Sequence, residues 1–350
     1  MALFVFGAGA TRGCSFVDPK TDPCLPPLDR DFFTQLQRVR NTKHKTLISQ
    51  FLQDVVEVFG ANFDVTVETV FTTLEHTIRM LNVTGENRAF KKQELQEKRV
   101  RLEQAIAVVL EDSLMEKDSE GHSKLTQRKC DYHDAFVAKI LQARDDIITF
   151  NYDCVLDFSL KDCGSSKWNP RYAYCFDLGS RGHRLEGDNF WEPQVKAEQD
   201  GTVHLLKLHG SLHFIVSGPD DKPKVKLKQR PYTKQNGNLQ FTIIPPEWHK
   251  AYDKGVFAKL WKHAADAIHG AKHIVVIGYS LPETDLHSTA LFRTSLLLRK
   301  LKSLVVVNPD RHTRKRIRTV LQRGLSKDTK VLSFERFEHF LSCDRQVWEI

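Results

Sequence analysis

Polar side chains that could bind a sugar or activate a water molecule follow two apolar runs of strand length. Asn151 and Asp153 come directly after residues 147–150, and His209 comes directly after residues 203–208. A neutral imidazole can act as a general base, while amide and carboxylate groups can hold hydroxyl groups or a water molecule in place. Structural roles are the alternative: Asp153 would cap a helix that starts at Val155, and His209 would simply be part of the fold.

A turn of small residues follows the first apolar run, residues 3–6. It contains Gly7, Ala8, Gly9 and Thr11. Such a turn lets backbone N–H groups approach a pyrophosphate where a helix or loop begins. The third glycine of the usual dinucleotide fingerprint is not at its usual place, so an ordinary tight turn is an equal alternative.

Two further runs end in small and hydrogen-bonding residues. Gly278 and Ser280 follow residues 273–277, and Asn308 follows residues 304–307. Residues at the carboxyl ends of strands bind ligands in open α/β sheets. Asp285 either contacts a ligand or caps the helix that the sequence predicts after it, with Thr284 as the other candidate cap.

Six apolar runs alternate with sequence of helical period, and these elements must position the side chains above. The runs cover residues 3–6, 147–150, 203–208, 273–277, 304–307 and 331–334. Several are apolar throughout, as strands are when helices cover both faces of a parallel sheet. The pattern predicts an α/β fold with a doubly wound, mostly parallel, Rossmann-like sheet.

Two long segments interrupt this pattern. Residues from about 30 to 145 carry apolar side chains at helical spacing, such as Phe51 and Val55, and predict a helical insert. Residues from about 159 to 250 lack a steady period and predict a small irregular module with a hairpin around residues 214–226. Because we detect no low-complexity linker and no internal repeat, we expect residues 1–350 to form one domain.

The composition predicts a cytoplasmic globular protein. The chain has 350 residues, 41% of them hydrophobic, and a net charge of +8. Its apolar start ends at Gly7, too soon for a signal peptide or a membrane span. Positive charge gathers in residues 222–230 and 311–323, but the second segment also has apolar residues at helical spacing. A solvated helix face is therefore favoured there over a nucleic-acid site.

The cysteines do not form a zinc-binding pattern. Seven are spread along the chain with no C-x-x-C pair. Four-coordinate structural zinc is usually held by closely spaced ligand pairs, and Cys163 with Cys175 is a single, loosely spaced pair. We therefore expect reduced, mostly structural cysteines, no zinc ribbon and no bound metal.

Taken in order, the motifs resemble the blocks of the sirtuins. The chain reads GAG-x-T, T-x-N-x-D, L-H-G-S, G-x-S and V-N-P, where sirtuins read GAG-x-S, TQNID, LHGS, GTS and N-L/P-E. The segments FTTLE at residues 71–75 and IIPPEW at residues 243–248 look like the divergent bacterial sirtuin-like NAD⁺ hydrolases of antiphage defence. The resemblance spans residues 3–310 and is closest at the predicted strand ends.

The resemblance implies an enzyme that cleaves the nicotinamide–ribose bond of NAD⁺ and releases nicotinamide and ADP-ribose. By it, Asn151 and His209 form the catalytic pair, and Asp153 lies where it could bind the carboxamide. The phosphates, ribose and adenine end would be held by a wider set, which comprises Gly7, Ala8, Gly9, Thr11, Gly278, Ser280 and Asn308. NAD⁺ is then the substrate, and no metal is expected.

The chain departs from the deacylating sirtuins in three respects. Phe150 replaces the glutamine of their TQNID block, a P-D-F-R segment is missing, and there is no four-cysteine module. A protein deacylase and a non-catalytic NAD⁺ or ADP-ribose sensor remain the alternative functions. An unregulated NAD⁺ hydrolase would deplete its own cell, so we expect control by homo-oligomerisation or by a partner, such as a HerA-type ring ATPase or a nucleic-acid-sensing protein.

Overall fold

A computed structural model describes residues 1–85, 91–119, 123–176, 184–185, 190–229, 231–232, 234–235, 238–245 and 252–349. Its centre is a parallel sheet in the strand order β15-β14-β13-β1-β4-β6. From β1 the chain adds β4 and β6 on one side and then β13, β14 and β15 on the other, so the strand order reverses between β1 and β13. This is the doubly wound order of Rossmann-like folds, and the predicted fold class is confirmed at that level.

All six predicted strands are present. They are β1 (Ala2–Phe6), β4 (Asp146–Thr149), β6 (His204–Lys207), β13 (His273–Ile277), β14 (Ser303–Val307) and β15 (Lys330–Phe334). Side chains of β1, β13 and β14 are buried along their whole length. Helices cover both faces of the sheet, which is why these strands are apolar without alternation.

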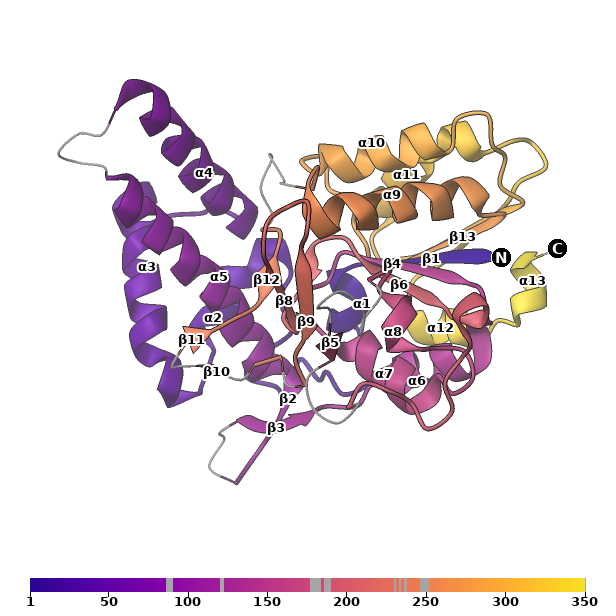
Figure 1. Cartoon of the computed structure of the whole chain (residues 1–350), viewed down its shortest axis with the longest axis horizontal. Helices are drawn as coiled ribbons and strands as arrows, with labels where there is room; N and C mark the ends of the chain where they lie inside the picture. Colours follow the sequence, from indigo (N-terminus) through magenta and orange to yellow (C-terminus); the bar gives the residue numbers. More distant parts are fainter. Residues whose placement is uncertain are drawn as a thin grey trace.

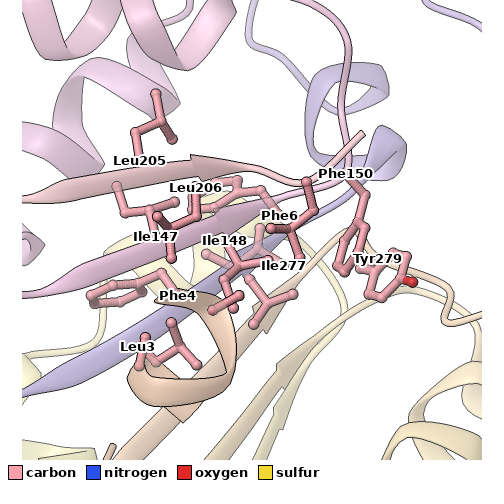
Figure 2. Packing of buried hydrophobic residues seen from close by; sticks show 14 of the residues in the cluster. Leu3, Phe4, Phe6, Ile147, Ile148, Phe150, Leu205, Leu206, Ile277 and Tyr279 are labelled. Atoms are coloured by element: carbon pink, nitrogen blue, oxygen red, sulfur yellow. The ribbon is translucent and has the colours of Figure 1, made fainter. Parts of the chain in front are cut away.

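Helices pack on the sheet in two layers (Figure 1). One layer holds α9 (Gly255–Gly270), α10 (Leu286–Ser295) and α11 (Arg311–Val320). The other holds α6 (Asp131–Ala135), α7 (Val155–Cys163), α8 (Pro170–Ala173), α12 (Phe337–Leu341) and α13 (Arg345–Glu349). The core between them contains side chains from β1, β4, β6 and β13, drawn together in Figure 2.

Four helices between β1 and β4 have a hydrophobic cluster of their own. They are α2 (Phe32–Gln37), α3 (Lys45–Phe59), α4 (Val67–Thr84) and α5 (Lys92–Leu114), and they lie beside the sheet in Figure 1. Phe51 and Val55 of α3 are buried in this cluster. A short antiparallel pair, β2 (Met115–Lys117) with β3 (Ser123–Gln127), follows α5. Helical periodicity gave no sign of this pair because its strands are too short to show a period.

The segment after α7 is built from short strands. The predicted hairpin is confirmed by β8 (Phe214–Ser217), which pairs antiparallel with β9 (Lys224–Leu227). The remaining short strands are β5 (Arg184–Leu185), β7 (Gly210–Ser211), β10 (Lys234–Gln235), β11 (Asn238–Leu239) and β12 (Thr242–Ile243).

The two basic segments have different environments. Ile317 and Val320 of α11 are buried while its basic side chains are exposed or half-buried, in agreement with the predicted amphipathic helix. In the first segment Lys228 is fully buried, and its Nζ donates to the carbonyl oxygen of Pro231 at 2.9 Å. Arg230 lies outside the described residues. Among the helices that the structure describes, none is long and apolar enough to cross a membrane.

Candidate functional site

The predicted motifs follow strand ends that are paired with one another across the sheet. Phe6 pairs with Thr149 and with Ile277, Thr149 pairs with Lys207, and Ile277 pairs with Val307. The glycine turn, Gly278 and Asn308 start one residue beyond these paired residues, and Asn151 and His209 lie two residues beyond them. The structure therefore brings these motifs to the same carboxyl edge, which is where doubly wound sheets bind ligands.

Asn151 is held by its amide nitrogen and leaves its amide oxygen unused. Nδ2 donates to the carbonyl oxygen of Gly7 at 3.1 Å and to Oγ1 of Thr11 at 3.0 Å. Oδ1 is buried, and no donor reaches it among the described residues. A buried acceptor without a donor costs free energy, so such atoms are found where a ligand or an ordered water completes the hydrogen bond.

Thr11 and Asp153 continue the hydrogen-bond chain that begins at the Asn151 amide. Thr11 Oγ1 donates to Asp153 Oδ2 at 2.8 Å, while Asp153 Oδ1 accepts the N–H of Val155 at 3.0 Å. Asp153 thus bonds the first N–H of α7, but the N-cap residue is Cys154 and not Asp153 as predicted. Both carboxylate oxygens are bonded within the protein, so the geometry ties Asp153 and Thr11 to the position of Asn151 more directly than to a ligand.

The glycine turn packs directly against the end of β13. Gly9 donates its N–H to the carbonyl oxygen of Gly278 at 2.8 Å, and a Cβ on Gly9 would lie 2.7 Å from that oxygen. Gly278 has φ +61°, and a Cβ on it would overlap the nitrogen of Ala10. Close approach of two backbones therefore explains both glycines. Ala8, at the start of α1 (Ala8–Arg12), is exposed at the tip of the turn.

The rings of Phe150, Tyr279 and His209 pack against one another at this edge. Phe150 and Tyr279 stack with their centroids 4.2 Å apart, and Figure 2 shows them side by side at the strand ends. His209, with only 7% of its surface exposed, meets the Phe150 ring edge-on at 5.1 Å. The Tyr279 hydroxyl donates to Asp285 Oδ2 at 2.8 Å, and Asp285 Oδ1 accepts the N–H of Ser288, so the predicted cap of α10 is confirmed.

A buried polar network lies under Asn151 and His209. Lys207 Nζ donates to the carbonyl oxygen of Asp153 at 2.6 Å and to Asp157 Oδ2 at 2.8 Å. Tyr174 donates its hydroxyl to Asp157 Oδ1 at 2.7 Å. Burial would raise the pKa of Asp157, but the charge of Lys207, the contact with His213 and the hydrogen bonds from Lys207 and Tyr174 together outweigh it and hold that pKa below its usual value. Burial lowers the pKa of His213, beside this pair, to about 3, so its ring is neutral.

Arginines of α11 border the far side of the edge. Arg316 donates from Nε and Nη2 to the carbonyl oxygen of exposed Ser280, at 3.2 and 2.7 Å. Arg314 donates to the carbonyl oxygen of Asn308 at 2.6 Å, while Asn308 Oδ1 accepts the N–H of Asp310. The side chains of the two arginines bring positive charge next to two of the predicted binding residues.

Helix α4 approaches the same edge from the neighbouring helical cluster. Glu68 Oε2 accepts a hydrogen bond from Thr284 Oγ1 at 2.7 Å. Thr72 lies one turn further along α4 on the same face. Its Oγ1 is buried and has no hydrogen-bond partner among the residues that the structure describes. Thr72 belongs to the FTTLE block, whereas Pro246, Glu247 and Trp248 of the second block lie outside the described residues.

Sequence reasoning missed the network under the site, although one signal pointed to it. Lys207 is a lysine between two leucines of a buried strand, and such a residue needs a buried partner. Asp157 and Tyr174 carried no comparable signal. Two clefts of about 280 and 300 Å³ lie elsewhere, and neither is lined by Asn151 or His209.

The site consists of a buried amide acceptor, a histidine at the equivalent strand position and an arginine-bordered rim, at the edge where the strand order reverses. It could orient a hydroxylated, anionic ligand and activate a water molecule or a hydroxyl group. Comparison of the chain with known protein families and with curated proteins finds no match, so these residues carry the functional argument.

Proposed function

We propose that the chain is an NAD⁺ hydrolase that cleaves the nicotinamide–ribose bond and releases nicotinamide and ADP-ribose. The observation that carries the proposal is Asn151 Oδ1, a buried acceptor without a donor among the described residues. A ribose hydroxyl or the attacking water would supply that donor. The sirtuin-like order of motifs identifies NAD⁺ as the ligand class.

Each group then has a task in the reaction. Cleavage develops positive charge on the ribose, so the sugar must be positioned and a nucleophile must be activated. Asn151 holds a ribose hydroxyl or the water, because Gly7 and Thr11 fix the orientation of its amide. His209 acts as the general base, and its equivalent position on the adjacent strand supports that role.

The diphosphate and adenosine would lie along the edge from the glycine turn to Asn308. The N–H of Gly9 donates to the carbonyl oxygen of Gly278 and is therefore not available to a phosphate. The turn would allow the diphosphate to approach the backbone closely, but it would not supply a full set of N–H donors. The positive charge of Arg314 and Arg316 complements the two phosphates. Ser280, exposed beside Arg316, supplies a hydroxyl at the same rim.

Nicotinamide release by the purified full-length chain tests the proposal. We expect Asn151→Ala and His209→Ala each to lower the rate about a hundredfold or more. His204→Ala is the matched control, because His204 lies at the opposite end of the same strand, and it should keep wild-type activity. Circular dichroism and thermal melting establish that each variant is folded. Near-wild-type activity of both edge variants would refute the assignment.

The same assay separates the alternative functions. A deacylase would release nicotinamide only when an acetylated peptide is present. A sensor would bind NAD⁺ or ADP-ribose, measured by calorimetry, without releasing nicotinamide at all. The proposed hydrolase releases it without peptide.

We propose further that this activity depletes NAD⁺ in antiphage defence and is controlled by assembly. The helices α2–α5 lie in the chain between the glycine turn and β4, and Glu68 of α4 contacts the site edge directly. Packing of a second copy or a partner chain on these helices would therefore move the edge. Specific activity should rise with protein concentration in step with the measured mass. Full activity in a dilute monomer would refute this control.

A further inference from the structure

Cys14, Cys130 and His133 meet in the interior, next to the candidate site but outside it. His133 Nδ1 lies 3.7 Å from Cys14 Sγ and 3.1 Å from Cys130 Sγ, and the three ligand atoms lie within 4.8 Å of one another. All three residues are buried. Two sulfurs and an imidazole nitrogen this close together form the donor set that thiophilic metal ions prefer.

The spacing of these atoms fits a tetrahedral zinc ion. Zn–S bonds of about 2.3 Å and Zn–N bonds of about 2.0–2.1 Å place sulfur and nitrogen ligands about 3.6 Å apart. The distance from Cys14 Sγ to Nδ1 already matches. Cys130 Sγ would move away from Nδ1 by about 0.5 Å, which a small change in side-chain torsion supplies.

The surroundings hold the ligands in place. Phe6 and Phe337 pack against the His133 ring at 5.7 and 5.4 Å, so its orientation is set by aromatic contacts. A bound metal ion would hold the two cysteines as thiolates, the form that binds metal.

We propose that Cys14, Cys130 and His133 bind one Zn²⁺, with a water molecule in the fourth position. The cleft of about 300 Å³ that Cys130 and Asp134 help to line offers the ion a route from solvent. Bound zinc would link Cys14, which follows α1, to helix α6. Thr11, three residues before Cys14, would be restrained by the same ion. The inference does not depend on NAD⁺ hydrolysis.

The proposed site departs from the expectation that the protein binds no metal. That expectation looked for ligand pairs close together in sequence, but Cys14 lies 119 positions before His133. Only Cys130 and His133, three positions apart, form a local pair, and they do so on α6. The cluster is not a zinc ribbon, since its ligands come from a loop and a helix that pack on the central sheet.

Metal binding by the full-length chain tests the proposal. Protein reduced and stripped with a chelator should take up one Zn²⁺ per chain by elemental analysis, and its melting temperature should rise. Co²⁺ in place of Zn²⁺ should give the absorption bands of a thiolate-bound ion. We expect Cys14→Ser and Cys130→Ser each to weaken Zn²⁺ binding at least about a hundredfold, more than the loss of an outer-shell contact costs. Cys343→Ser, remote in sequence and half-buried, is the matched control and should bind like wild type.

Several results would overturn the site. They are reduced wild-type protein that refuses Zn²⁺, serine variants that bind it as tightly as wild type, and binding of Cu⁺ without Zn²⁺. A Cys14–Cys130 disulfide in protein that takes up no zinc after reduction would also overturn it. If a serine variant fails to fold, the wild-type cobalt spectrum decides: thiolate-to-cobalt bands support the proposal, and their absence overturns it.

Discussion

Replacing Lys207 by methionine should destabilise the protein and loosen the turn that carries Asn151. Lys207 and Asp157 are buried almost completely, with 1% and 0% of their side chains exposed, and their charged atoms lie 2.8 Å apart. Methionine keeps the apolar stem of the lysine but leaves the carboxylate without its counter-charge. Removing one partner of a buried pair costs about 3–5 kcal/mol, because the other charge stays buried.

A second loss falls on the candidate site itself. Lys207 Nζ is a donor to the carbonyl oxygen of Asp153 at 2.6 Å, and Lys207→Met removes it. An unsatisfied buried acceptor costs about 1–3 kcal/mol, part of which a water molecule can recover. We therefore expect the free energy of unfolding to fall by about 4–8 kcal/mol in total, less the part that a water molecule recovers. The rate of nicotinamide release should fall with it at temperatures where the variant is folded.

Urea denaturation at pH 7, followed by circular dichroism, measures the loss. Lys129→Met is the matched control: its pair with Asp162 is exposed, with 72% and 35% of the side chains accessible, and its removal should cost under about 1 kcal/mol. The double variant Lys207→Met with Asp157→Asn removes the uncompensated charge and should recover part of the stability. A Lys207→Met loss below about 1 kcal/mol, or a double variant no more stable than the single one, would refute the reasoning.

Two further predictions follow from other contacts of this edge. Burial lowers the pKa of His213 from 6.5 to about 3, so between these pH values the unfolded chain binds a proton there that the folded chain does not. The free energy of unfolding should therefore fall as the pH drops from about 6.5 towards 3, by up to about 1.4 kcal/mol per pH unit. His213→Asn should flatten this slope in pH-dependent denaturation, and an unchanged slope would contradict the role. Gly278→Ala should lower the free energy of unfolding by about 2–4 kcal/mol, because a side chain there is strained at φ +61° and overlaps Ala10. Gly60 also has a positive φ, but open space surrounds it, so Gly60→Ala is the matched control and should lower the melting temperature less. Equal losses in thermal melts would show that the close approach at Gly278 is unimportant.

The strands and the cap of α10 could be read from the sequence because their causes are local. A short apolar run bounded by turn residues favours a buried strand, and Asp285 caps α10 through an N–H only three residues away. The motifs at the strand ends were found for the same reason. Once the sheet is parallel, its carboxyl ends must share an edge.

The contacts that define the site were decided only by the tertiary structure. The Asn151 amide is oriented by Gly7 and Thr11, which are 144 and 140 positions away. Lys207 finds its partner 50 positions back, and Cys14 meets His133 across 119 positions. Such pairs leave no periodic trace in the sequence, because their spacing depends on where helices and loops place the chain in space. The sequence by itself determined which residues reach the sheet edge. Packing determined which of their atoms are already bonded there, and that Asn151 Oδ1 has no donor among the described residues.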